Sequence, residues 1–323
     1  MFRRLYKFYS ALLPCHNAAR RNKYKGLKVG LGELAAISAA IVWAFSTLLY
    51  KTFSHHLSPL QLNVSKGLLA SLMMVAAIVI TADSNIPQQV AAWGWLIAGG
   101  IIGIAIGDSA YFGALRNIGP ARTLVIESLA PALAGILNIL LLGHYLSTLA
   151  WVGIIVTTVG VVIAIRPQHA LPNVDKRHYF IGVSLALLAA LCQATGMVMS
   201  KGAMNLESMS SLWAAMIRLV SGTLTVALVV ALVKHSDLYQ AIRLKGIDKK
   251  HWLLVAVFFG TFIGLWLQLA SVKYTDPAIA QTLFATAPLM VMTFGFFKRE
   301  PVSANMILGG ILALAGVGIL LAN

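Results

Sequence analysis

The chain has 323 residues, of which 59% are hydrophobic and only 11% are charged. Soluble domains are about 25% charged, so this inventory cannot supply a water-facing surface and indicates a polytopic membrane protein. Lys and Arg outnumber Asp and Glu by 25 to 10. A nucleic-acid-binding protein would need a folded basic face with interleaved aromatic side chains, and we expect no nucleic-acid partner.

The first 31 residues form a basic tail. Residues 1–28 hold eight of the 25 Lys and Arg residues and no acid. This tail could contact anionic lipid, but a cytoplasmic anchor that sets the orientation is the simpler interpretation. It lacks the apolar core and cleavage site of a signal peptide. We expect both termini on the same, cytoplasmic side, although the Lys and Arg residues of the body favour the opposite orientation.

Ten segments then follow that are apolar over about 20 residues, the length that crosses a bilayer as a helix. The polar stretch 167–178 is a linker that separates five segments from five, so the chain divides into units 32–166 and 179–323. The predicted fold is an all-α membrane protein with ten transmembrane helices. Their expected bounds are 32–52, 58–81, 92–115, 120–142, 149–166, 179–203, 208–233, 251–273, 277–297 and 303–322.

The second unit repeats landmarks of the first in the same order. Pro120 and Pro131 recur as Pro277 and Pro288, and further matches join Gly103 to Gly260, Gly107 to Gly264, Lys51 to Lys201 and Lys66 to Arg218. Because five is odd, the second unit enters the membrane from the opposite side. Two inverted five-helix repeats are typical of transporters with a site at the repeat interface. Pro131 and Pro288 lie inside their helices and would bend them; each is a hinge candidate or a static bend.

Four charged residues lie deep within predicted spans: Lys66, Asp108, Glu127 and Arg218. Charges at that depth are costly and normally face the bundle interior or water. Lys66 and Arg218 are candidates for binding an anionic substrate group, or else for a structural ion pair. Removal from water favours the protonated form of a carboxyl group, so Asp108 and Glu127 are proton-coupling candidates. The alternative is a carboxylate held by Lys66, Arg116 or a neighbouring hydroxyl.

Neutral polar and aromatic residues in the spans complete the predicted substrate site. Aromatic faces and amide groups suit an amphipathic metabolite, although each residue alone is more often used in helix packing. Besides Lys66 and Arg218, the predicted substrate-binding residues are Trp43, Tyr111, Gln193, Trp266, Gln268 and Gln281.

The sequence offers little for catalysis or for a cofactor. Cys15 and Cys192 cannot build a disulfide framework or a structural metal site. Neither a P-loop nor a HExxH motif occurs, and Asp108 is the only Asp within a predicted span, whereas an intramembrane aspartyl protease needs two. We expect no catalytic residues, no metal and no cofactor.

Two matching stretches resemble a known family. GDSAYFGALRNIGPARTLVIESLAPALAGILNILLLG at 107–143, and LQLASVKYTDPAIAQTLFATAPLMVMTFGFFKREPVS at 267–303, resemble the helix 3–helix 4 signature of EamA-type proteins in the drug/metabolite transporter superfamily. The resemblance spans 32–322. It implies a ten-helix inverted-repeat fold that exports or exchanges small metabolites such as amino acids. It also implies a cavity lined by Trp43, Asp108, Glu127, Gln193, Gln268 and Gln281. We expect an integral protein of the bacterial inner (plasma) membrane.

The leading hypothesis is therefore a secondary transporter, an exporter or exchanger of small amphipathic or zwitterionic solutes, acting as a monomer or homodimer in the lipid bilayer. A channel or a lipid-carrier flippase on the same fold is the main alternative. An intramembrane enzyme is the least favoured because the motifs that it requires are missing.

Overall fold

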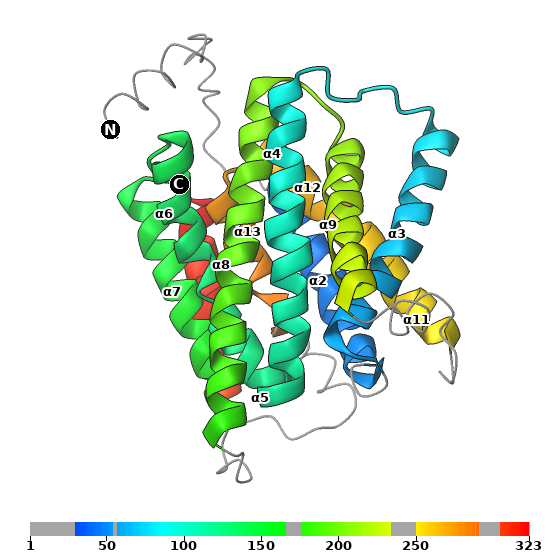
Figure 1. Ribbon diagram of the computed structural model, residues 1–323. Helices are drawn as coiled ribbons and strands as arrows, with labels where there is room; N and C mark the ends of the chain where they lie inside the picture. The colour runs from blue at the N-terminus through cyan, green and yellow to red at the C-terminus, as the bar shows by residue number, and fades with distance from the viewer. Residues whose placement is uncertain are drawn as a thin grey trace, which may run out of the picture.

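The computed structural model describes residues 30–53, 57–165, 176–233, 250–287, 289–290 and 304–322, and these ranges are almost entirely helical (Figure 1). Within them, six helices are long and apolar enough to cross a membrane, and three shorter apolar helices lie at Ala130–Leu142, Thr148–Ala164 and Ile307–Leu321. A membrane protein built of helices is thus confirmed. The number of ten spans stays a prediction.

Most helices begin and end within a few residues of the predicted bounds, but the helix Ser109–Glu127 crosses the predicted gap at 116–119 with a kink at Gly119, and residues 291–297 of the predicted ninth span lie outside the described residues. In the first unit they are α2 (Leu31–Phe53), α3 (Pro59–Thr81), α4 (Val90–Gly100), η1 (Ile101–Asp108), α5 (Ser109–Glu127), α6 (Ala130–Leu142) and α7 (Thr148–Ile165). In the second they are α8 (Lys176–Leu206), α9 (Ser211–Val233), α11 (Lys250–Ala256), η2 (Val257–Ile263), α12 (Gly264–Tyr274), α13 (Pro277–Phe284) and α15 (Ala304–Leu321).

Local sequence explains where two of these helices start. The Ser58 hydroxyl accepts the Gln61 amide at 3.2 Å, and the Gln61 side chain accepts the Ser58 amide at 2.9 Å, so a capping box precedes Pro59. At α13 the Asp276 carboxylate accepts the Ala278 amide at 2.8 Å, with Pro277 in the first turn. Both arrangements satisfy amides that would otherwise lack partners at a helix start.

The first helices of the two units, α2 and α8, run in opposite directions. A β-carbon built on Gly32, at the start of α2, would lie 2.9 Å from the Thr275 β-carbon. The Lys201 ammonium, near the end of α8, donates to the Thr275 carbonyl at 3.1 Å. The start of α2 and the end of α8 therefore meet at the same end of α12, so α2 and α8 run in opposite directions. The inversion expected from five-helix repeats is present in these helices.

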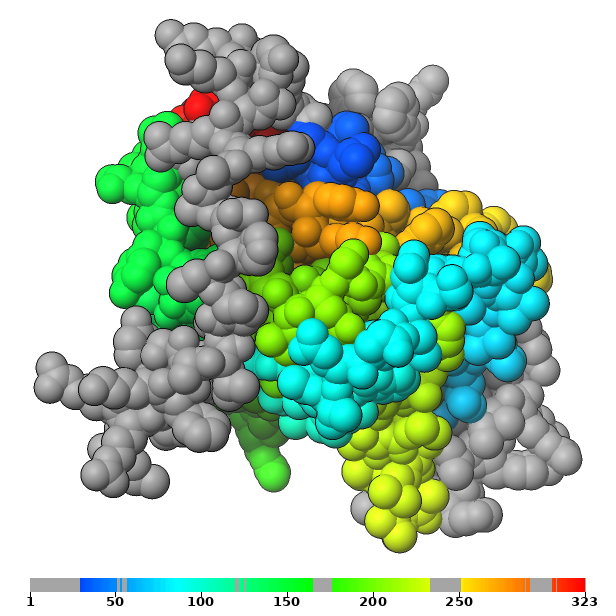
Figure 2. Space-filling model, turned by 90° about the horizontal axis from the view of Figure 1, so that it is seen from above, coloured from blue at the N-terminus to red at the C-terminus, as the bar shows by residue number. Residues whose placement is uncertain are grey.

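Each unit inserts a π-helical segment between the first two helices of the other. The segment η1 packs between α8 and α9, and η2 packs between α2 and α3. Figure 2 shows the orange and yellow-green helices of the second unit between the dark-blue start of α2 and the cyan region around α4. The π-helical turns were not predicted; π-helical insertions are frequent at functional sites.

Small residues allow this close interlocking. A β-carbon on Gly260 in η2 would lie 2.8 Å from the Ser46 hydroxyl of α2, and one on Gly196 in α8 would lie 3.2 Å from the Gly103 α-carbon of η1. Backbones can approach in this way only where side chains are absent or short. The matched glycines Gly103 and Gly260 thus both lie at close contacts between helices.

Both proline-containing spans are broken at matching positions. In the first unit the helix turns at Ser128–Leu129, between α5 and α6, and in the second at Ala285–Thr286, after α13. Ser128 and Ala285 have the same backbone angles, φ −64° and ψ −5°. Pro131 has no amide hydrogen for the Glu127 carbonyl, and its ring crowds that carbonyl, which explains the first break. Pro288 lies outside the described residues, and hinge motion at either proline stays a prediction.

Candidate functional site

A cavity lies at the centre of the molecule and is lined by both units. The empty space among its lining residues measures about 930 Å³, a figure that includes the part open to solvent. Both helix breaks border it, through Ser128 and Ala130 in one unit and Ala285 and Ala287 in the other. Nine of the residues that we predicted from the sequence line it: Trp43, Lys66, Asp108, Tyr111, Glu127, Gln193, Arg218, Gln268 and Gln281.

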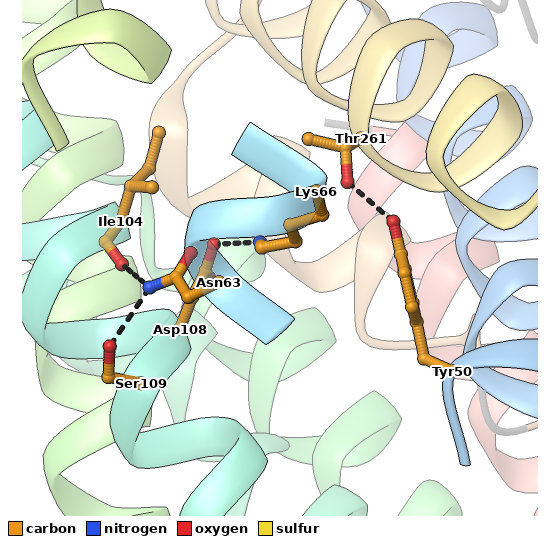
Figure 3. Close-up of polar contacts among 7 residues, drawn as sticks. All are labelled: Tyr50, Asn63, Lys66, Ile104, Asp108, Ser109 and Thr261. Carbon is orange, nitrogen blue, oxygen red and sulfur yellow. Dashed lines mark hydrogen bonds and ion pairs between the residues drawn. The ribbon is translucent and has the colours of Figure 1, made fainter. Parts of the chain in front are cut away.

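Lys66 and Asp108 form an ion pair at the edge of the cavity (Figure 3). The Lys66 side chain is 2% exposed, whereas that of Asp108 is 21% exposed and faces the cavity. The Lys66 ammonium also lies 5.2 Å from the centre of the Phe112 ring, a favourable cation–π distance. The ion pair neutralises both charges, and a role of Lys66 in binding the solute stays a prediction.

Hydrogen bonds between helices fix the backbone around this pair. The Asn63 side-chain amide donates to the Ile104 carbonyl at 2.8 Å and to the Ser109 hydroxyl at 2.9 Å. The hydroxyl groups of Tyr50 and Thr261 lie 2.7 Å apart. Asn63 and Tyr50 thus tie α3 to η1 and α2 to η2 (Figure 3), which holds both π-helical segments in register beside the cavity.

Arg218 lines the same cavity but has no ion-pair partner among the described residues. It is 1% exposed, its Nε has no hydrogen-bond partner, and its Nη1 reaches only the Met197 sulfur, at 3.7 Å. A thioether is a weak acceptor. A buried guanidinium is therefore available to a ligand.

Glu127 is an acidic residue of the same cavity that, like Arg218, has no ion-pair partner among the described residues. Its carboxyl group lines the cavity beside the first helix break, and no described residue forms an ion pair or hydrogen bond with it. The charge that acts on it most strongly is that of Asp108. An unpaired carboxyl group in a partly closed site can exchange a proton or meet a cationic group of a solute.

Aromatic rings and amides form the rest of the lining. The Trp43 ring lies 6.0 Å from the Tyr111 ring and 5.8 Å from the Phe284 ring, centre to centre. The Gln281 side-chain nitrogen is buried without a hydrogen-bond partner. The site thus offers apolar ring faces together with an uncommitted donor, which suits an amphipathic solute.

Trp266 does not line the central cavity. Its indole N–H donates to the Ser211 hydroxyl at 3.2 Å, and it lines a separate polar groove at the surface with Lys273 and Tyr274. Residues two apart on a helix point in different directions. Gln268 lines the central cavity and Trp266 does not, and a place for Trp266 in the substrate site stays a prediction.

Several lining residues were not predicted from the sequence. Phe284 is the counterpart of Glu127 in the second repeat, and it faces the same cavity. That correspondence was the available signal for it. Thr261 and Leu265 each follow a glycine, Gly260 and Gly264, and had no distinguishing pattern. Among the described residues no group of three His, Cys, Asp or Glu side chains could hold a metal ion.

Comparison with known proteins decides the family. The sequence matches the EamA-like transporter family over residues 30–166 and again over 180–322. The chain belongs to this family. Membership makes it a membrane transporter by family, and the double match agrees with a two-repeat architecture.

Other comparisons add the fold alone. No curated protein sequence matches the chain significantly. A solved structure titled "Crystal structure of protein" superposes with a TM-score of 0.71 over 89% of this chain and 95% of its own, at 18% identity. At that identity the likeness supports the EamA fold and says nothing about cargo.

Proposed function

We propose that this EamA protein is a secondary transporter that exports or exchanges small amphipathic metabolites, amino acids and related compounds among them, through the central cavity. The observation that carries the proposal is that the cavity is shared by two inverted units and bordered by a helix break from each. Discontinuous helices at a repeat interface commonly form transporter sites, and rocking of the units alternates access to them.

The lining fits a solute with an apolar part and a charged part. The Trp43, Tyr111 and Phe284 rings supply one surface. Gln193, Gln268 and Gln281 supply amides, and Arg218 and Glu127 supply one unpaired charge of each sign. A lipid carrier with a long chain would need an apolar groove that continues to the lipid, whereas these polar groups converge on a central site.

Glu127 is the preferred proton carrier in this proposal. Asp108 is committed to Lys66, so its protonation would release a buried ammonium. Glu127 forms no ion pair with any of the described residues, so its protonation would not leave a buried cation without a partner. We further propose that both termini face the cytoplasm of a bacterial inner membrane, and that the protein acts as a monomer or homodimer.

Counterflow tests the function directly. The full-length protein is reconstituted into liposomes loaded with one unlabelled amino acid at a time, and uptake of the same labelled amino acid is followed. Transient accumulation that saturates with concentration is expected for at least one amphipathic amino acid. A voltage-driven current without saturable counterflow would support a channel instead.

A voltage-independent exchange of lipid between leaflets, without solute counterflow, would support the flippase.

The Gln281→Leu variant of this protein is the matched control for solute binding in the cavity. Gln281 lines the cavity and is 1% exposed, and the substitution removes its amide at similar volume. We expect this variant to fold and to lose affinity for the solute.

A further inference from the structure

Arg218 reaches the cavity through a gap between two glycines on other helices. A β-carbon on Gly103 of η1 would lie 2.8 Å from Arg218 Nη2, and one on Gly196 of α8 would lie 2.6 Å from the same atom. Real β-carbons essentially never approach another heavy atom so closely. The absence of side chains at both positions therefore determines where the guanidinium lies.

The guanidinium held in this gap is short of partners. It carries five N–H donors, yet its Nε is unpartnered and its Nη1 contacts only the Met197 sulfur. Leaving buried polar groups unsatisfied is costly, and more so when they are charged. An anionic ligand would satisfy the N–H donors of Arg218 that lack partners in the solute-free protein, so the site is suited to such a ligand.

No carboxylate of the described residues takes that role. Asp108 is the negative charge that acts on Arg218 most strongly, but it pairs with Lys66 instead. In the repeat, Lys66 corresponds to Arg218, and Asp108 corresponds to Leu265. The second unit thus keeps the cation and replaces its partner by a leucine, which also lines the cavity.

We infer that Arg218 binds a carboxylate group of the transported solute, and that Gly103 and Gly196 are positioning residues that seat its guanidinium. This inference rests on the proposed function only in taking the ligand to be the transported solute. A planar guanidinium matches a carboxylate in two parallel hydrogen bonds. One unpaired cation balances a singly charged group such as a carboxylate, whereas a phosphate dianion would need additional cationic side chains.

Matched probes separate the carboxylate from the rest of the ligand. Full-length protein in detergent is titrated by calorimetry with three acid–amide pairs: propionate and propionamide, 3-phenylpropionate and 3-phenylpropanamide, L-phenylalanine and L-phenylalaninamide. In at least one pair, the wild type binds the acid at least about tenfold more tightly than the amide, since charged hydrogen bonds are lost in the amide. Arg218→Met removes this preference. Arg218→Lys keeps part of it and guards against a folding defect in the first variant.

The glycines are tested by alanine variants. The far end of a flexible side chain can move aside, so Gly103→Ala displaces the guanidinium without unfolding the protein. We expect it to weaken acid binding about tenfold while amide binding stays unchanged. In an Arg218→Lys background the same substitution has no further effect, because lysine has no Nη2 atom. Gly202→Ala is the control, since Gly202 lies on the same helix as Gly196 and a β-carbon on it would lie 3.2 Å from the Trp95 ring and would not meet Arg218.

The outcomes keep this inference apart from the proposed function, because equilibrium binding does not require transport. Acid preference that disappears with Arg218 supports the carboxylate site even if counterflow fails. Equal binding of acid and amide in every pair, or acid preference that survives Arg218→Met, overturns it even if counterflow succeeds. Loss of acid binding in Gly202→Ala as large as in Gly103→Ala would overturn the positioning role.

Discussion

The two units of this EamA protein handle their intramembrane cation differently. Lys66 in the first unit is neutralised by Asp108, whereas the second unit has Leu265 in place of Asp108, and Arg218 has no ion-pair partner among the described residues. The helix breaks and π-helical segments, by contrast, occur in both units at matching positions. The features that both units share therefore shape the cavity, whereas the residues that differ between the units determine which charged groups line it.

Glu127 is the second such departure, because Phe284 occupies its counterpart position. Glu127→Gln removes the unpaired carboxyl group at nearly constant volume. We expect it to abolish accumulation driven by a pH gradient in proteoliposomes while counterflow at equal pH continues. Phe284→Leu, at the corresponding position of the second unit, should leave accumulation driven by the pH gradient intact. Full pH-driven accumulation in Glu127→Gln would contradict the proton-carrier role.

Asp108→Leu converts the first unit to the pattern of the second. It leaves the Lys66 ammonium buried and unpaired, which costs about 3 kcal/mol in comparable buried pairs. We expect a marked fall in the thermal unfolding temperature in detergent. The double variant Lys66→Met and Asp108→Leu should regain most of that loss, because an apolar pair replaces an ionic one. Equal stability of Asp108→Leu and the wild type would show that the pair contributes nothing.

Leu265→Asp performs the opposite conversion and places a carboxylate in the cavity that Arg218 also lines. We expect it to weaken binding of 3-phenylpropionate about tenfold, the scale of one lost charged hydrogen bond. Leu265→Asn is the neutral control and should have a smaller effect. Calorimetry on both variants decides, and equal affinities would mean that Arg218 does not bind the acid.

Pro131→Ala tests whether the helix break, which occurs once in each unit, acts as a hinge. It restores an amide hydrogen opposite the Glu127 carbonyl and allows the helix to continue through Ser128 and Leu129. A hinge role predicts that the maximal counterflow rate falls roughly two- to fivefold, since gating motions often limit turnover, with little change in affinity. An unchanged rate would mean that the break is a static shape.

Much of this arrangement could be predicted from the sequence because duplication leaves a long-range signal. Matching prolines, glycines and cations gave the inverted repeat, and the cost of charge in apolar spans pointed to Lys66, Asp108, Glu127 and Arg218. All four line the cavity. Which cation pairs with Asp108 depends on how the helices rotate and approach each other, and spacing along the chain does not fix that.

The π-helical segments limit prediction in another way. Each one adds residues to a turn and so rotates every side chain that follows, relative to a regular α-helix. Trp266 lies three residues after the end of η2, and its indole contacts Ser211. Asn63 and Tyr50 gave no signal because their partners, on η1 and η2, depend on how the helices pack. Their contacts follow from the tertiary structure alone.

The central claim is that the cavity between the two inverted units opens in turn to each side of the membrane. Gln281 lines this cavity and is buried. Gln281→Cys in a Cys15→Ser and Cys192→Ala background can be treated with a membrane-impermeant thiol reagent in right-side-out and in inside-out vesicles. We expect labelling from both sides, slowed in each case by the amino acid that shows counterflow. Labelling from one side only, or labelling that this amino acid does not slow, would contradict alternating access through this cavity.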